Sequence, residues 1–224
     1  MDPAYLNISE STGGQLFLFQ KNEVAQASLV MNVSYTHPAT ILRAIGNLSG
    51  TRDFEFPVDS AVESVLVLAS LQCRNAVLVS RPNGTELTVA NSAQSVDLQA
   101  GRILRIDQPE AGRWRVRLSG TGLFVLSVLA KTNTKLTEVT LSGARQSVEV
   151  HLAGQFSQLR LQLIDAAGNP LSEAAPLEQT TAGSYQINIT PPAERFRILV
   201  SGLDASALPF QRVYPNLFQP HPPK

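Results

Sequence analysis

Cysteine is almost absent from this chain of 224 residues, which contains only Cys73. A single thiol cannot close an internal disulfide, so the folded domains must be held together by burial of apolar side chains. We interpret Cys73 as a buried thiol that packs like a small hydrophobic residue. The alternative is a half-cystine whose partner lies elsewhere in a longer chain.

Excess charge and long apolar runs are missing as well. The 18 Lys and Arg residues balance the 18 Asp and Glu residues, which suggests neither a nucleic-acid partner nor a membrane-surface protein. The longest apolar stretches, such as Val65–Ala69 and Leu123–Ala130, are well below the roughly 18 residues of a membrane helix, so we expect no membrane insertion. Met1–Tyr5 has neither the basic nor the apolar region of a signal peptide.

Patterns of catalytic or metal-binding residues are also lacking. No Gly-x-Ser-x-Gly elbow is present, and one cysteine with the scattered His37, His151 and His221 cannot supply a zinc site. Asp53, Glu55 and Asp59 are close enough to suggest calcium, but Asp53 and Glu55 share one face of a strand, which favours a solvated surface. We expect no enzymatic activity, no catalytic residue, no cofactor and no metal.

From about residue 53 onward, apolar and β-branched residues alternate with polar ones, which is typical of strands. Six strands are predicted in a first block over 50–134: Ser64–Leu71, Ala76–Ser80, Ser95–Leu98, Ile103–Ile106, Trp114–Leu118 and Leu123–Ala130. Gly120-Thr121-Gly122 lacks the third glycine and the helix of a phosphate loop, so a hairpin turn is predicted there. Short strands at this spacing indicate a sandwich or jelly roll.

A second β block is predicted over 135–205, and it fits a small immunoglobulin-like or fibronectin-like sandwich. Its predicted strands are Thr137–Leu141, Ser147–Leu152, Gln158–Ile164, Ser184–Ile189 and Phe196–Val200. Asp165–Pro170 is expected to be a turn, because Asp and Asn bond locally to backbone and Gly168 tolerates positive φ. The proline-rich tail, 206–224, should be an extended linker from Pro209 onward.

The first 35 residues differ from the rest. Leu16–Phe19 predicts a strand after the Gly13-Gly14 turn, and Asn22 is placed to cap a short helix with Val24, Ala27, Leu29 and Met31 among its apolar positions. One such βα unit cannot bury both faces of its strand. We therefore interpret 1–35 as the end of a larger domain.

Five Asn-x-Ser/Thr sequons occur, and such sequons accept glycans only in the secretory pathway. The candidate N-glycosylation residues are Asn7, Asn32, Asn47, Asn83 and Asn188. They favour an extracellular, secreted glycoprotein, which would have to derive from a longer precursor that carries the signal peptide.

The strand around Trp114 allows two interpretations. Alternation puts Trp114, Val116 and Leu118 on one face and Arg113, Arg115 and Arg117 on the other. Trp114 is then a core aromatic above a solvated arginine face. Alternatively, the aligned guanidinium groups, joined by Arg102 or Arg105, form a candidate anionic-ligand face for a sulfated glycan or an acidic partner.

Several stretches resemble the region that ends the von Willebrand factor A domain of hemicentin-like proteins and continues into their next two domains. Tyr5–Phe17, followed by the predicted helix, resembles the closing strand and last helix of the A domain. The stretches that resemble a galactose-binding-like sandwich are Phe54–Asp59, Val65–Ser70, Val79–Gly84 and Ala111–Trp114. Those that resemble an immunoglobulin-like module are Ser201–Asp204 and Pro209–Arg212. The resemblance covers nearly the whole chain.

The resemblance implies a non-enzymatic structural or interaction module of an adhesion or matrix-type protein, with a protein or matrix partner that the sequence does not name. The metal site of an A domain needs an Asp-x-Ser-x-Ser motif that this chain lacks, so no metal ligand is carried over. A galactose-binding-like fold does not imply sugar binding. The competing hypothesis is a carbohydrate-binding module that uses loops of the first sandwich or the arginine strand.

Overall fold

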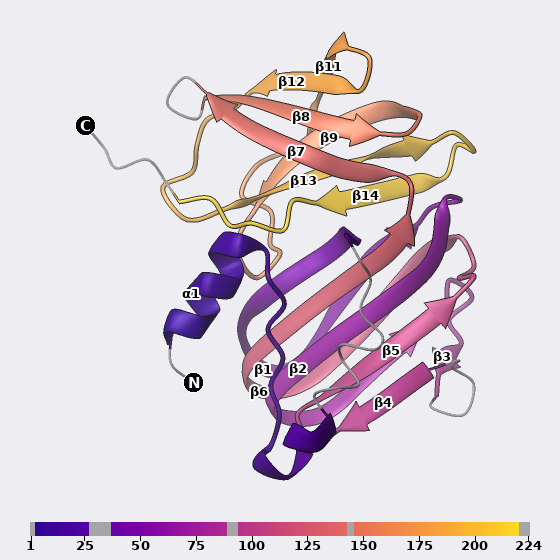
Figure 1. Cartoon of the computed structure of the whole chain (residues 1–224), viewed down its shortest axis with the longest axis vertical. Coiled ribbons are helices and arrows are strands. Elements are labelled where there is room, and N and C mark those ends of the chain that lie inside the picture. Colours follow the sequence, from indigo (N-terminus) through magenta and orange to yellow (C-terminus); the bar gives the residue numbers. More distant parts are fainter. Residues whose placement is uncertain (1–2, 27–36, 89–93, 143–145, 220–224) are drawn as a thin grey trace.

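The computed structural model describes residues 3–26, 37–88, 94–142 and 146–219, and most of them form antiparallel strands (Figure 1). This confirms the predicted all-β class. Two β-domains follow one another along the chain, and an N-terminal segment lies beside both of them. No helix among the described residues is long and apolar enough to cross a membrane.

The first domain is a single six-stranded sheet of order β1-β6-β2-β5-β4, with β3 paired to β2. Its strands are β1 (Ala39–Val58), β2 (Val62–Ser80), β3 (Glu86–Leu87), β4 (Gln94–Leu98), β5 (Gly101–Asp107) and β6 (Gly112–Thr132). The boundary predicted at residue 50 therefore lies inside β1. The predicted strands at 64–71 and 76–80 are parts of one strand, β2.

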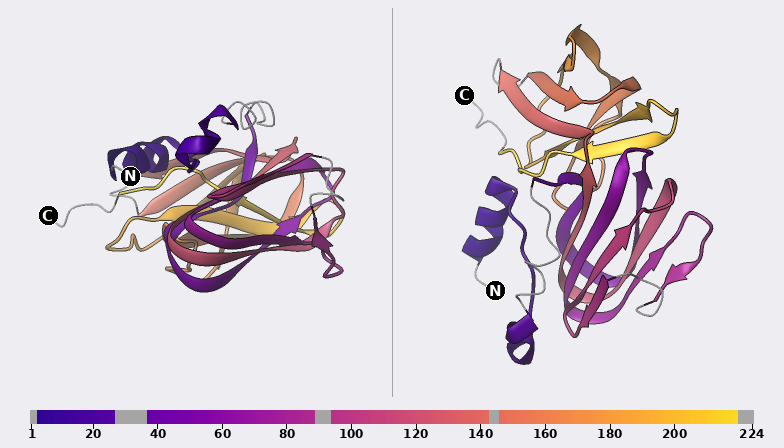
Figure 2. Two further views of the ribbon diagram at one scale, coloured as in Figure 1. Left: turned by 90° about the horizontal axis from the view of Figure 1, so that it is seen from below. Right: turned by 45° about the vertical axis from the view of Figure 1, so that its right-hand side comes forward.

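The long strands β1, β2 and β6 bend, so that the two halves of the sheet enclose one core (Figure 2). In β6 the residues on the inner face run without a break from Trp114 to Ala130, with Gly120 and Gly122 at the bend. A Cβ on Gly120 would lie 2.2 Å from the Cys73 carbonyl oxygen, so only glycine allows this approach. The hairpin turn predicted at Gly120–Gly122 is therefore wrong: the glycines bend a continuous strand.

The half of the sheet that contains Leu66, Ile103 and Leu129 is buried on both faces. Its inner face belongs to the main core, and its outer face forms a second apolar cluster with Leu66, Leu68 and Ile103. Phe17 and Phe19 of the N-terminal segment pack on this outer cluster. Burial on both sides explains why the apolar runs at 65–69 and 123–130 are continuous rather than alternating.

The N-terminal segment differs from its prediction. It contains helix α1 (Pro3–Thr12) and a 3-10 helix, η1 (Lys21–Gln26), whereas the strand expected at Leu16–Phe19 does not form. These residues lie across the outer face of the sheet without pairing in it, and the Leu18 N–H donates to Ser70 Oγ at 3.2 Å. The rest of the predicted helix, including Ala27, Leu29 and Met31, lies outside the described residues.

The second domain is a sandwich of two four-stranded sheets, of order β10-β9-β13-β14 and β11-β12-β8-β7, around its own apolar core. Its strands are β7 (Lys135–Ser142), β8 (Ser147–Ala153), β9 (Phe156–Ile164), β10 (Ala175–Pro176), β11 (Glu178–Thr181), β12 (Ser184–Asn188), β13 (Arg197–Asp204) and β14 (Pro209–Val213). The predicted turn at Asp165–Pro170 is confirmed, with Asn169 N–H donating to Asp165 Oδ1 at 2.7 Å and Gly168 at φ 85°.

The linker predicted from Pro209 onward is wrong for the described part of the tail. β14 pairs with β13, and Phe218 bridges to Phe196 and stacks on Tyr214. The aromatic and aliphatic side chains between the prolines are buried in the second domain, and this burial outweighs the extended preference of the prolines.

Candidate functional site

A buried cluster of charges joins α1 to both domains. The Glu10 carboxylate of α1 lies between Arg43 of β1 and Arg197 of β13, whose side chains are fully buried. Arg43 Nη2 donates to Glu10 Oε1 at 3.2 Å, and Arg197 Nη2 donates to the other oxygen. The helix thus turns its acidic residue inward while Tyr5 and Ile8 face solvent. Figure 1 shows α1 beside the junction of the two domains.

Backbone carbonyls complete the surroundings of these two guanidinium groups. Arg43 also donates to the carbonyls of Ser9, Gly13 and Gly14, the last at 2.7 Å. Arg197 donates to the Ala166 carbonyl at 3.0 Å. Burial lowers the pKa of Arg43, and burial lowers the pKa of Arg197 to about 10. At about 10 the pKa of Arg197 leaves this group charged near neutral pH, and Glu10 pairs with both guanidinium groups in the interior.

A second buried contact joins the domains directly. Asp59, which follows β1, lies 2.8 Å from Arg212 of β14, and both side chains are almost completely buried. Asp204 accepts hydrogen bonds from the Ser60 N–H at 2.8 Å and the Ser60 hydroxyl at 2.6 Å. Burial opposes ionisation of Asp204, but these bonds and those from Ser206 and Leu208 lower its pKa.

Neither buried contact was predicted from the sequence. One signal was present: Arg43 interrupts an apolar strand, and Arg197 interrupts another. Charged residues are almost never fully buried unless they are paired, so such an interruption indicates a buried partner. A buried arginine does not by itself identify its acidic partner. Here the partner could not be found from the sequence, because Glu10 and Arg197 are separated by most of the chain.

The arginine strand has the predicted alternation. Trp114, Val116 and Leu118 are buried in the core, and the Trp114 Nε1–H donates to the Glu110 carbonyl at 2.8 Å. Arg113, Arg115 and Arg117 point outward and are exposed. The interpretation of Trp114 as a core aromatic is therefore correct.

The arginines face Asp53 and Glu55 on the neighbouring strand β1. Arg113 and Arg115 each lie 3.0 Å from one oxygen of Glu55, while Arg117 binds both oxygens of Asp53 at 2.7 and 2.9 Å. These bonds hold the pKa of Glu55 and of Asp53 below their usual values. Three guanidinium groups thus share two carboxylates, and the strand face carries a smaller net charge than its sequence suggests.

The two other arginines considered for this face do not join it. Arg102 is buried and donates to the carbonyls of Val77 and Leu87. Arg105 pairs with Asp107 at 2.9 Å. The predicted anionic-ligand face was therefore too large. The sequence does not show that β2 separates β5, which carries Arg102 and Arg105, from β6.

The remaining sequence candidates lie mostly at the surface. Asn7, Asn47, Asn83 and Asn188 are exposed, whereas Asn32 lies outside the described residues. Cys73 is a free, exposed thiol, so its prediction as a buried residue is wrong. It lies between two register shifts of β2, at the bend, where the strand turns this side chain away from the core.

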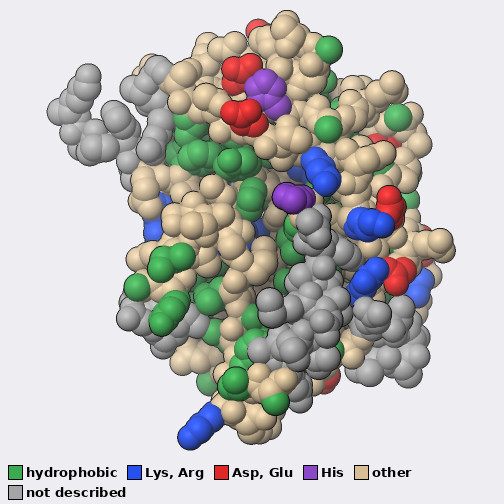
Figure 3. Space-filling model, viewed as in Figure 1, with side chains coloured by type: hydrophobic (Ala, Val, Ile, Leu, Met, Phe, Trp, Pro, Cys, Tyr) green, Lys and Arg blue, Asp and Glu red, His purple; other side chains and the backbone are tan. Residues whose placement is uncertain are grey.

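Ser184, His151 and Glu149 form a further polar cluster on the second domain. Ser184 Oγ lies 2.9 Å from His151 Nδ1, and His151 Nε2 lies 3.6 Å from Glu149. These residues are neighbours across β8 and β12 on the outer face of the second domain, where Figure 3 shows acidic side chains around a histidine. Because β12 is paired on both sides, its N–H groups belong to the sheet and offer no oxyanion donors. We interpret the cluster as a cross-strand hydrogen-bonded pair with an acidic neighbour.

No group of three or more His, Cys, Asp or Glu side chains in the described part of the chain is arranged to hold a metal ion. No family model and no curated protein sequence matches the chain.

Several solved structures match weakly. Lipase BlEst2 of Bacillus licheniformis in its propeptide form has a TM-score of 0.41 and 15% identity over 87% of this chain and 46% of that chain. The adhesin domain of Epf from Streptococcus pyogenes has a TM-score of 0.27 and 11% identity over 80% and 76%. Beta-glucuronidase 3 of Bacteroides uniformis has a TM-score of 0.27 and 9% identity over 77% and 27%. The chain thus spans about half of the lipase, and all three similarities are too low to assign a function.

Proposed function

We propose that this chain is a non-enzymatic structural and interaction module of an extracellular, adhesion or matrix-type protein, in which two β-domains are held in one orientation. The observation that carries this proposal is the pair of buried charged contacts at the junction, Glu10 with Arg43 and Arg197, and Asp59 with Arg212. Movement of one domain against the other would leave these charges buried and unpaired, which costs several kcal/mol per ion.

Strand order supports the finer fold assignment of the second domain. One sheet has the order β11-β12-β8-β7 and faces a sheet of order β10-β9-β13-β14. This corresponds to the ABED and GFC sheets of an immunoglobulin-like sandwich with one short extra strand. The galactose-binding-like assignment of the first domain, and the origin of residues 1–35 in a von Willebrand factor A domain, rest on the sequence resemblance alone.

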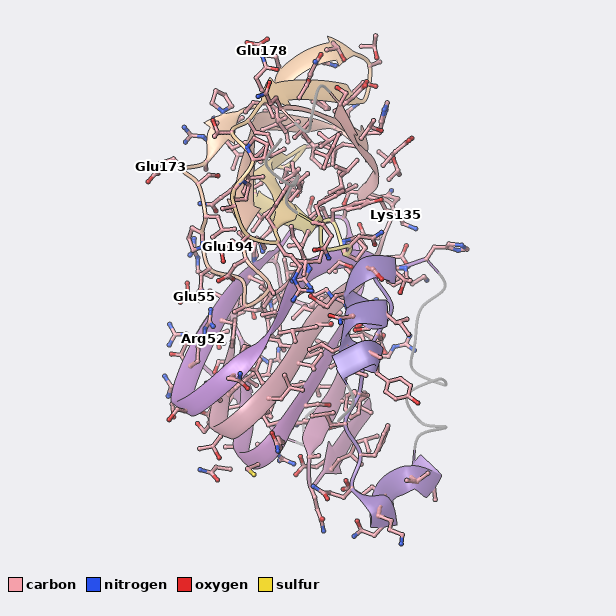
Figure 4. The ribbon with its side chains drawn as sticks, turned by 90° about the vertical axis from the view of Figure 1, so that its left-hand side faces the viewer. Arg52, Glu55, Lys135, Glu173, Glu178 and Glu194 are labelled. Carbon is pink, nitrogen blue, oxygen red and sulfur yellow. The ribbon has the colours of Figure 1, made fainter. Side chains whose placement is uncertain are left out.

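Pulsed electron resonance tests the fixed orientation. One spin label goes on Cys73 of the first domain, and a second goes on Glu178→Cys at the far end of the second domain (Figure 4). We expect one narrow distance distribution, because ordinary interdomain interfaces permit motion but this one contains buried ion pairs. Asp59→Asn should broaden the distribution. A broad distribution in the parent chain would contradict a rigid module.

Glycan attachment tests the extracellular location. The chain would be secreted from cultured animal cells behind an added signal peptide, and its mass measured before and after enzymatic removal of N-glycans. We expect occupancy of Asn83, which lies in an exposed turn with Gly84 at φ 85°, and Asn83→Gln should remove one glycan. A folded, secreted chain without glycans would mean that the sequons are accidental.

A binding function for Arg113, Arg115 and Arg117 as one face is less favoured than the sequence suggested. Arg117 is bound by both oxygens of Asp53, so a ligand would have to displace a two-bond ion pair. Arg113 and Arg115 share a single carboxylate and therefore retain excess positive charge.

A further inference from the structure

Two neighbouring hollows lie on the surface beside Glu55 and Arg113, which line both of them. The first, of about 300 Å³, lies between the two domains and is also lined by Arg160, Ser201 and Gln211. The second, of about 230 Å³, lies on the first domain and is also lined by Arg81 and Arg115. Figure 4 shows Glu55 on the outside of the first domain near its boundary with the second.

The charge along these hollows is strongly one-sided. Four arginines line them, namely Arg81, Arg113, Arg115 and Arg160, against the single carboxylate of Glu55. Glu55 is already shared by Arg113 and Arg115. Among the described residues, Arg81 and Arg160 have no ion-pair partner, so one uncompensated guanidinium lies at each end. We name this set of four residues the arginine track.

The second domain places Arg160 in the track through its strand register. Ser201 of β13 pairs with Arg160 of β9 on one side and with Gln211 of β14 on the other, so the three residues form one row across the sheet. The ladder shifts between Ser201 and Leu203, and Gln158 has a positive φ of 54° beside this shift. A non-glycine residue in this conformation is strained, and strained residues and bulges concentrate at binding sites.

The chemistry of the track favours a partner that is recognised by charge and hydrogen bonds alone. The aromatic residues that line the hollows, Phe56, Phe210 and Trp114, are at most 1% exposed and belong to the cores. Protein interfaces are usually anchored by accessible aromatic residues, and single-stranded nucleic acids stack their bases on them. A linear polyanion with hydroxyl groups needs no such anchor.

We propose that the arginine track binds a linear sulfated glycan that crosses the domain boundary. Sulfate groups contact Arg81 at one end, Arg113 and Arg115 in the middle and Arg160 at the other end, while Ser201 and the Gln158 amide meet sugar hydroxyls. The inference rests on the proposed extracellular module, since it names the partner of that module. It also requires the fixed orientation of the domains, because Arg160 and Arg113 come from different domains.

Arg117 provides a matched control for this site. It lies on the same strand face as Arg113 and Arg115 and is about as exposed as Arg115, at 44% against 47%, but it lines neither hollow and is held by Asp53. Arg81→Ala, Arg160→Ala and Arg117→Ala each remove one surface charge. A non-specific attraction between the whole protein and a polyanion would therefore weaken by similar amounts in all three variants.

Binding of a fluorescent heparin octasaccharide to the full chain, measured by anisotropy at several salt concentrations, tests the track. Arg81→Ala and Arg160→Ala should each weaken binding about five- to tenfold and lower the slope of log Kd against log salt by about one. Arg117→Ala should weaken it less than about twofold. Desulfated heparin should bind at least about tenfold more weakly, because the track then loses its anionic contacts.

Three outcomes would overturn the proposal: no binding at low salt, an equal loss in Arg117→Ala, or tighter binding of an oligoglutamate peptide than of heparin. Spin-label distances measured in the same variants separate this result from the proposed module. Lost binding with an unchanged narrow distance distribution would reject the glycan and leave the rigid module intact. A broad distribution would reject the rigid module itself.

Discussion

Glu10→Gln is expected to lower the free energy of unfolding by about 3–5 kcal/mol. The substitution keeps the size of the side chain but removes the carboxylate that pairs with both Arg43 and Arg197. Both guanidinium groups remain buried, and the pKa of Arg197 at about 10 leaves it protonated at pH 7. Two like charges then face each other without the carboxylate that pairs with both, although the charge of Asp165 still favours the charged form of Arg197. The loss should appear as a lower urea midpoint with an unchanged m-value.

Glu63→Gln is the matched control. Glu63 pairs with Lys131 at 2.6 Å, but both side chains are 61% exposed, so this variant should cost less than about 1 kcal/mol. A triple variant, Glu10→Gln with Arg43→Met and Arg197→Met, should recover much of the loss, because apolar residues of similar volume often replace buried ion pairs without net cost. A change below about 1 kcal/mol in Glu10→Gln would show that α1 does not hold the junction.

Gly120→Ala is expected to destabilise the first domain by about 3–5 kcal/mol, with positive-φ strain and overpacking contributing together. Gly120 has φ 153° at the bend of β6, and its added Cβ would lie 2.2 Å from the Cys73 carbonyl oxygen. The obstacle is backbone, which cannot turn aside like the end of a side chain. Strands β2 and β6 would have to separate where the sheet bends.

Gly50→Ala separates the steric effect from the conformational one. Gly50 pairs with Gly120 across the same bend and has φ 99°, but no atom lies within 4 Å of its added Cβ. It should cost about 1–2 kcal/mol, from the left-handed conformation alone. Thermal unfolding of both variants gives the comparison. Equal losses at the two positions would mean that the close approach of β2 and β6 is not limiting.

Gly120→Ala tests the packing within the first domain, and Glu10→Gln tests the contact between the two domains. Gly120 determines how tightly the sheet of the first domain closes on its core, whereas Glu10 determines how α1 links that sheet to the second domain. The arginine track depends on both, because Arg113 and Arg115 lie on the bent sheet, Arg81 directly follows its strand β2, and Arg160 lies across the boundary. A variant that loosens the junction should therefore weaken heparin binding without altering any arginine.

Local patterns predicted much of the β-structure. The alternation around Trp114 correctly separated core from surface residues, and the turn at Asp165–Pro170 followed from side chains that bond to their own backbone. Of the eight described strands of the second domain, five were predicted close to their observed positions, namely β7, β8, β9, β12 and β13, whereas β10, β11 and β14 were not predicted. Each of these features depends on residues within a few positions of one another, so a short stretch of sequence contains the information.

The errors came from contacts between distant residues. A pair of glycines can form a hairpin turn, or it can bend a long strand where a neighbouring strand comes close. Gly120 and Gly122 do the second, because β2 approaches β6 closely at this point. An apolar run such as Leu16–Phe19 forms a strand only if a neighbour offers a free edge, and here it covers the outer face of a sheet. The exposure of Cys73 depends on the same bend.

The sequence by itself determined the all-β class, five strands of the second domain and the inward side of the arginine strand, because period-two alternation and turn residues act locally. Only the tertiary structure decided three contacts. Glu10 pairs with Arg43 and Arg197, Asp53 pairs with Arg117, and Arg160 lines the same hollow as Arg113. Charges act through space, and their partners here are separated by as many as 187 positions in the chain, so no pattern of neighbouring residues could have paired them.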